Sequence, residues 1–224
     1  MVASLSLSAH SASFAAESKD DYEIAFGVKS DKPDTFFEQG VFLYKLGKYE
    51  EAIASFEQAI EINPNYHEAW YNRGITLNDL GRYEEAIASY DQALEIKPDY
   101  HQAWNNRGSA LFSLERKEEA IASYNQALRI KPDYYQVWYV RGLAFASLKR
   151  YEEAITSYDQ ALEIQPDYDQ IWNSRGIAFA LSEKYEEAIA SYDQAIKIQP
   201  DYYQAWLNRG INLDNLSKYE EAIA

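Results

Sequence analysis

The chain has 224 residues, of which 36 are acidic and 21 are basic, so that it carries a net charge of −15, and it contains no cysteine. A surface that follows nucleic-acid phosphates needs clustered Lys and Arg, so this charge argues against nucleic-acid binding. The lack of cysteine excludes disulfides and thiol chemistry, and no apolar run reaches the roughly 18 residues of an integral membrane segment.

The first 32 residues differ in pattern from the rest of the chain. Residues 1–16 are rich in Ser and Ala without helical periodicity, which predicts a partly disordered leader. The alternative is the remnant of a targeting segment, because small residues such as Ala15 and Ala16 suit a signal cleavage site, although the basic start of a signal is missing. We expect a cytoplasmic protein, with export to the periplasm as the alternative if residues 1–16 belong to a signal peptide.

A period of 34 residues organises the chain from residue 33 onward. Five tryptophans are each separated by 34 residues, a glycine follows each of them by four residues, and a proline precedes each by six. The tryptophans are Trp70, Trp104, Trp138, Trp172 and Trp206. A fixed period of this length indicates stacked structural repeats. We place the units at 33–66, 67–100, 101–134, 135–168, 169–202 and an incomplete 203–224.

Each complete unit is predicted to form a helical hairpin. Apolar residues recur at helical spacing in both halves, for example Trp70 and Leu77 in the first half and Ile87 and Tyr90 in the second. We expect the tryptophans to fill the core and Gly74 to lie where the two helices cross closely. One hairpin cannot bury its apolar face alone, so consecutive units are expected to stack into an all-α solenoid.

Seven positions of a unit match the signature of a known family. They are Trp70, Gly74, Leu77, Ala86, Tyr90, Ala93 and Pro98. With this pattern the chain resembles the tetratricopeptide repeat family, and in particular the tandem arrays of cyanobacterial and other bacterial proteins. The resemblance implies a right-handed superhelical solenoid of stacked antiparallel helical hairpins. It also implies that the first helices line a concave groove, which holds a peptide or a helix of a partner protein.

The residues after each tryptophan vary between units and are the candidates for the peptide-binding groove. The candidates are Tyr71, Asn72, Asn105, Asn106, Tyr139, Asn173, Ser174 and Asn208. An amide offers both a hydrogen-bond donor and an acceptor, so a row of asparagines can pair with the main chain of an extended peptide. The alternative is that these asparagines are solvated residues of the groove wall that were inherited by duplication.

An arginine precedes the repeated glycine in five units. The five are Arg73, Arg107, Arg141, Arg175 and Arg209. Such a row could capture a carboxylate or a phosphate of a ligand. Acidic residues recur with the same period, among them Glu57, Asp159 and Asp193. We therefore expect arginine–carboxylate pairs inside the protein.

The sequence shows no motif for catalysis or cofactor binding. It has no Gly-rich phosphate loop, no nucleophile elbow and no pair of histidines spaced for a metal, so we expect no enzymatic activity, no cofactor and no metal. The predicted function is a scaffold that binds a protein or peptide partner. The alternative is a substrate-docking or regulatory arm of a larger enzyme whose catalytic domain is not in this chain.

The sixth unit stops at Ala224, before its second helix is complete. Solenoids normally end in a polar capping element, so we expect the chain to be a fragment of a longer array. An uncapped hairpin exposes an apolar side. The C-terminal repeat is therefore expected either to fray after about residue 203 or to associate with a second copy.

Overall fold

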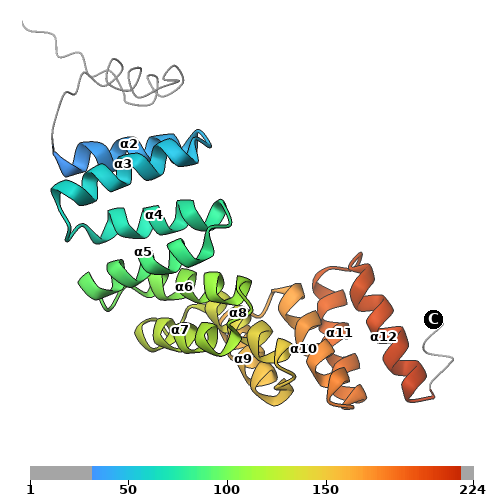
Figure 1. The fold of residues 1–224 in the computed structure, drawn as a ribbon. Helices are drawn as coiled ribbons and strands as arrows, with labels where there is room; N and C mark the ends of the chain where they lie inside the picture. Colours follow the sequence, from blue (N-terminus) through green and yellow to red (C-terminus); the bar gives the residue numbers. More distant parts are fainter. Residues whose placement is uncertain (1–31, 218–224) are drawn as a thin grey trace, which may run out of the picture. The chain divides into compact units, whose positions relative to one another are not determined.

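The computed structural model describes residues 32–217, which form eleven helices and no strand (Figure 1). The first helices of the hairpins are α2 (Pro33–Lys45), α4 (His67–Asp79), α6 (His101–Ser113), α8 (Tyr135–Ser147), α10 (Asp169–Leu181) and α12 (Tyr203–Asn215). The second helices are α3 (Tyr49–Ile62), α5 (Tyr83–Ile96), α7 (Lys117–Ile130), α9 (Tyr151–Ile164) and α11 (Tyr185–Ile198). The all-α class predicted from the sequence is confirmed.

The second helices begin and end at points that the sequence explains. Two acidic residues occupy the first turn of each, as Glu84 and Glu85 do in α5, where the positive end of the helix dipole favours negative charge. Two residues after the last helical residue comes a proline, which the helix cannot accommodate in its interior. In α5 the last residue is Ile96, and the proline is Pro98.

The turn inside each hairpin needs a residue in the left-handed region of the backbone. Gly47 and Gly81 both have a φ of 75° at this point, which glycine adopts without steric cost. The equivalent residues of the later hairpins are Glu115, Lys149 and Glu183, with φ between 59° and 61°. The turn is thus retained where the glycine is lost, although a Cβ makes this conformation less favourable.

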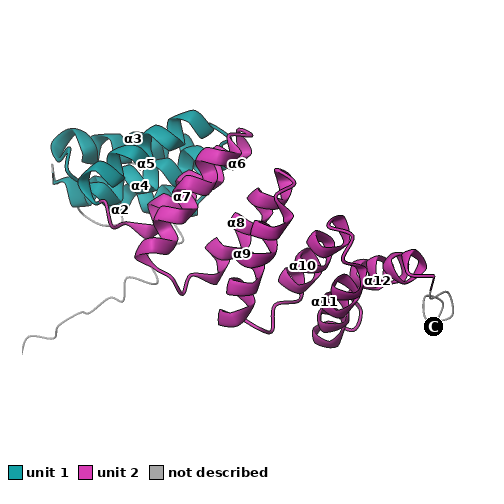
Figure 2. Cartoon of the chain, turned by 90° about the horizontal axis from the view of Figure 1, so that it is seen from below, with its two compact units in different colours: residues 1–97 teal, residues 98–224 magenta. Residues whose placement is uncertain are grey.

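The hairpins are grouped in two compact units (Figure 2). The first unit ends at Lys97 and contains α2 to α5, and the second begins at Pro98 and contains α6 to α12. Each second helix packs against the first helix of its own hairpin, and α3, α7, α9 and α11 also pack against the first helix of the next hairpin in the same unit. The hairpins of each unit therefore stack, as expected for a helical solenoid.

The core of each hairpin combines small residues with one aromatic ring of the second helix. Tyr90 is 1% exposed, and Ala86 and Ala93 beside it on α5 are fully buried. A Cβ added to Gly74 would meet Cε1 of Tyr90 at 2.6 Å, so only glycine leaves room for this ring. The prediction that Gly74 lies at a close helix crossing is confirmed.

The prediction that the tryptophans fill the core is wrong. Trp70 is only partly buried and Trp206 is 46% exposed, whereas the residue before each tryptophan is fully buried, as Ala69 is. The indole explains the difference, because its N–H needs a hydrogen-bond acceptor. Trp70 Nε1 donates to the main-chain oxygen of Pro64 at 3.0 Å. The other four tryptophans repeat this bond, which holds each ring beside the loop that enters its helix.

Two sets of predictions fall outside the described residues. Of the leader, residues 1–32, the structure describes only Lys32, and at the other end the description stops at Ser217. The first helix of the last unit is described and is regular, as α12 (Tyr203–Asn215), so the expected fraying from about residue 203 is not seen within residues 203–217. The targeting segment, the localisation, the second helix of the last unit and its self-association remain predictions.

Candidate interaction surface

The candidate groove residues all lie on first helices, and neighbouring first helices contact each other within each unit. In the first unit α2 contacts α4, and in the second unit α6, α8, α10 and α12 contact one another in that order. The candidates of the second unit therefore lie on a series of adjacent helices. We call this set the first-helix face, and it consists of Asn105, Asn106, Tyr139, Asn173, Ser174 and Asn208.

The two candidates of the first unit lie on α4. Tyr71 is half-buried, and the side-chain amide of Asn72 donates to the main-chain oxygen of Glu68, at 2.8 Å. The adjacent helix α2 is joined to α4 by the Tyr44 hydroxyl, which donates to the Asp79 carboxylate at 2.6 Å. This bond is the main reason that the pKa of Tyr44 is raised to about 12.

Side chains of the first-helix face bridge adjacent helices directly. The hydroxyl of Tyr139 on α8 lies 3.4 Å from Oγ of Ser174 on α10. The amide of Asn208 on α12 donates to Oδ1 of Asn173 on α10, at 3.2 Å, and Asn173 is only 7% exposed. These candidate residues therefore form part of the contact between hairpins.

The remaining members of the face are half-buried. The amide of Asn105 donates to Oδ1 of Asn106 at 3.1 Å, so these neighbours on α6 are held by each other. The ring of Tyr139 lies 6.0 Å from that of Tyr158 and 6.4 Å from that of Tyr168, measured between centroids. Burial above all, and the charge interaction with Tyr139 to a smaller extent, raise the pKa of Tyr158. Tyr139 is thus anchored by its ring, and its hydroxyl lies beside Ser174.

Exposed apolar residues on the same helices were not among the sequence candidates. On α10 Ile177 is 39% exposed and Leu181 is 56% exposed, and on α12 Leu207 is 61% exposed and Ile211 is 51% exposed. Ile177 and Leu181 follow Asn173 at steps of four residues, which places all three along one side of the helix. The repeat gave no signal for Ile177 and Ile211, because their position is apolar in every unit except the one with Ser109 and so has the composition of a core position.

The repeated arginines point toward partners inside the protein. Three form ion pairs with the preceding second helix, namely Arg73 with Glu57 at 2.8 Å, Arg175 with Asp159 at 2.7 Å and Arg209 with Asp193 at 2.6 Å. Arg175 also donates to Oγ of Ser191 at 2.8 Å and so connects α9, α10 and α11. The predicted internal pairing is confirmed for these arginines, which leaves no basis for proposing anion capture.

Arg141 differs from the other arginines because the equivalent partner is an amide. Its guanidinium donates to Oδ1 of Asn125 at 2.9 Å and to Oγ of Ser157 at 3.2 Å. It lies over the ring of Trp138, with Cζ 4.2 Å from the centroid. Burial lowers the pKa of Arg141 to about 10.

Neither a metal cluster nor a membrane helix is found in residues 32–217. No group of three or more His, Cys, Asp or Glu side chains in this range is arranged to hold a metal ion. None of the helices in the same range combines the length and the apolarity needed to cross a bilayer.

Comparison with known sequences gives a family. A sequence model described as tetratricopeptide repeat matches residues 37–101, 97–135 and 107–169, and a second one of the same description matches residues 170–202. No curated protein matches the chain.

Solved structures of similar fold are numerous. MamA from Desulfovibrio magneticus RS-1, residues 41 to the end, is 19% identical with a TM-score of 0.72, over 78% of this chain and 99% of that one. YrrB, a TPR protein with an unusual peptide-binding site, is 22% identical with a TM-score of 0.71, over 82% of this chain and 95% of that one. A thermophilic TPR protein from Thermus thermophilus is 26% identical with a TM-score of 0.57, over 81% and 98% of the two chains.

Proposed function

Because the chain belongs to the tetratricopeptide repeat family, whose tandem arrays are protein-interaction scaffolds, we propose that it binds a peptide or a helix of a partner protein on the first-helix face of its second unit. The observation that carries this proposal is the exposure of large apolar side chains beside the candidate amides. Ile177 and Leu181 extend along α10 from Asn173, and Leu207 and Ile211 lie on the adjacent α12.

The chemistry of this surface favours an amphipathic partner segment. Exposed apolar side chains gathered on neighbouring helices favour the burial of a partner's apolar side chains. The amides of Asn105 and Asn106 and the hydroxyl of Tyr139 supply polar groups on α6 and α8 for the main chain of the same segment. YrrB, one of the proteins of similar fold, has a peptide-binding site, which supports the choice of a peptide as the ligand.

The test is a binding measurement with selected peptides. The full chain is immobilised, peptides are selected from a random display library, and their Kd values are measured by calorimetry. The double variant Ile177→Glu/Leu181→Glu should weaken the selected peptides by about tenfold or more, which corresponds to about 1.4 kcal/mol. Asn105→Ala and Tyr139→Phe should weaken them less, because each removes one hydrogen-bonding group.

Ile164 provides a matched control. It is 39% exposed like Ile177 but ends α9, a second helix. The variant Ile164→Glu should therefore keep the Kd of the selected peptides within about twofold, since surface changes outside a binding site have small effects. Selected peptides that bind the double variant as tightly as the parent, or that lose affinity in Ile164→Glu instead, would show that the first-helix face is not the binding surface.

A further inference from the structure

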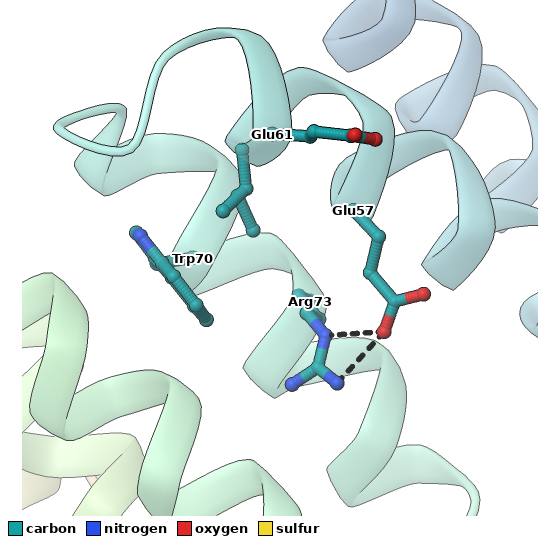
Figure 3. Close-up of a pocket in the computed structure, with 5 residues that line it drawn as sticks. Glu57, Glu61, Trp70 and Arg73 are labelled. Atoms are coloured by element: carbon teal, nitrogen blue, oxygen red, sulfur yellow. Dashed lines mark hydrogen bonds and ion pairs between the residues drawn. The ribbon is translucent and has the colours of Figure 1, made fainter.

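A small pocket lies between α3 and α4 in the first unit, and it shares no residue with the candidate groove. It is lined by Glu57, Ile60 and Glu61 of α3 and by Trp70 and Arg73 of α4 (Figure 3). Its volume is about 230 Å³, below the roughly 300–1,000 Å³ of pockets that take drug-sized ligands. The size suits a single side chain of a partner.

In the second unit, the protein places its own arginine over the equivalent tryptophan ring. The guanidinium carbon of Arg175 lies 5.4 Å from the ring centroid of Trp172, and that of Arg209 lies 5.9 Å from that of Trp206. Both distances are within the range of about 6 Å in which a cation is attracted to an aromatic face. In each case the same guanidinium is bonded to an aspartate of the preceding helix.

At Trp70 the arrangement differs, because the carboxylate partner of the arginine is one methylene group longer. The residue that pairs with the arginine is Glu57, where the second unit has Asp159 and Asp193. Nε and one terminal nitrogen of Arg73 both donate to Oε1 of Glu57, at 3.0 Å and 2.8 Å, and the guanidinium is turned toward this carboxylate (Figure 3). Among the described residues no cation lies over the Trp70 ring, and the pocket occupies the space beside it.

The charges around the pocket favour a cation. Arg73 is half-buried and neutralised by Glu57, and its third nitrogen is bonded to Oγ of Ser89 at 2.7 Å. Glu61 lies one helical turn after Glu57 and also lines the pocket. Its side chain is exposed and extends away from Trp70 (Figure 3), and an exposed side chain of this length can rotate toward a bound cation. With two carboxylates and one guanidinium, the lining has a net charge of −1, on a chain whose net charge is −15.

We propose that this pocket binds an arginine side chain of a partner protein. The guanidinium of the partner takes the place over Trp70 that Arg175 takes over Trp172, its methylene groups contact Ile60, and its charge is paired with Glu61. The ligand is thus a basic peptide segment. The arginine–tryptophan contacts inside the second unit have the geometry that we propose for its arginine. A planar guanidinium also stacks on an indole better than an ammonium does.

The test follows the indole N–H signals of the full chain by NMR during titration with a peptide. The probe is acetyl-Gly-Arg-Gly-amide, and the control peptide replaces arginine by citrulline, which has nearly the same shape but no charge. The signal of Trp70, assigned by its loss in Trp70→Phe, should move in a saturable way with the arginine peptide and remain in place with the citrulline peptide. Raising the ionic strength should weaken the effect, because the carboxylate pair is exposed.

Three variants decide whether the named residues are responsible. Glu61→Gln should weaken binding by about threefold or more, in keeping with the loss of one exposed ion pair. Glu57→Asp should weaken it too, by allowing Arg73 to take the position over the ring that Arg175 has. Glu163→Gln, the equivalent of Glu61 beside Trp172, should leave binding unchanged. Equal movement of all five indole signals, equal binding of the citrulline peptide, or parent-like affinity of Glu61→Gln would overturn the proposal.

Discussion

The side-chain amide of Asn208 donates a hydrogen bond to Oδ1 of Asn173, at 3.2 Å, and so connects α12 to α10. The two residues are 35 positions apart, one more than the repeat length, because each first helix meets its neighbour with a small offset. Asn173 is 7% exposed, and the Asn208 amide supplies a donor to its buried oxygen. A polar group buried among helices is stable only when it is bonded.

The first prediction follows from this pair. Asn208→Ala removes the donor and leaves the oxygen of Asn173 buried without it, which should lower the free energy of unfolding by about 1–2 kcal/mol. The control is Asn215→Ala, which removes an exposed asparagine of the same helix, two turns after Asn208. It should change the free energy of unfolding by less than about 0.5 kcal/mol. Urea unfolding of both variants is the measurement, and equal stability of the two would contradict a structural role for the Asn208 amide.

The second prediction concerns the close contact of Gly108 with Tyr124. A Cβ on Gly108 would meet Cε1 of Tyr124 at 2.6 Å, and this ring is only 2% exposed. Replacing glycine by alanine inside a helix normally stabilises it by about 1 kcal/mol. Here Gly108→Ala should instead destabilise by about 1–3 kcal/mol, because the core is overpacked. Ser113→Ala, at an exposed position of the same helix, is the control, and a variant Gly108→Ala more stable than the parent would show that the ring can move aside.

The third prediction concerns the left-handed turn between α10 and α11. Glu183 has a φ of 61° there, whereas Gly81 occupies the equivalent turn with a φ of 75° and no atom within 4 Å of an added Cβ. Glu183→Gly should therefore stabilise the chain, by up to about 1 kcal/mol, since it relieves the left-handed strain. Glu183→Ala keeps the Cβ and should bring no such gain. Thermal unfolding of both variants is the measurement. An alanine variant as stable as the glycine variant would contradict the prediction.

The helices and hairpins could be predicted because the same spacing of apolar residues recurs in successive 34-residue units. Gly74 and Tyr90 keep their spacing through the units, so their contact could be expected from one unit alone. The burial of the tryptophans could not be predicted, because Trp70 and the fully buried Ala69 are adjacent and both lie near the packed side of the helix. Periodicity shows the direction of a side chain about the helix axis, but the distance to the next hairpin decides its burial.

The candidate surface was predictable only in part for a related reason. The sequence marks variable positions on the first helices, but the partner of Asn173 is in the next unit, with an offset of one position that a single unit does not reveal. The exposed apolar residues were missed because Ile177 has the composition of a core position and is 39% exposed all the same.

The fourth prediction concerns alkaline pH. Burial raises the pKa of Tyr158 above that of an unfolded tyrosine, so its protonated form is favoured in the folded state. This contribution is fully present below a pH of about 10, the pKa of the unfolded group, and is lost as the pH rises through the folded pKa. Tyr158→Phe cannot ionise, and the fall of its unfolding free energy above pH 10 should be shallower than that of the parent by up to about 1.4 kcal/mol per pH unit. Tyr203→Phe, at a position 70% exposed, should keep the slope of the parent, and equal slopes for all three proteins would contradict the prediction.

The fifth prediction restores a carboxylate that one hairpin lacks. Arg141 meets Asn125 where Arg175 meets Asp159, and burial lowers the pKa of Arg141 to about 10. Asn125→Asp should create the ion pair and raise the unfolding free energy at pH 7 by about 0.5–1 kcal/mol, a modest gain because the site is partly open to solvent.

The gain in Asn125→Asp should depend on pH with a definite sign. The new carboxyl group would have a folded pKa below the unfolded value of about 3.9, so its contribution is present above that pH and disappears as the pH falls through the folded pKa. Asn125→Ala serves as the control, since it removes the hydrogen bond that Arg141 now makes and should be less stable than the parent at both pH values. Urea unfolding at pH 7 and at pH 3 tests both variants. If Asn125→Asp were equally stabilising at the two pH values, the gain would come from helix packing and not from a charge pair with Arg141.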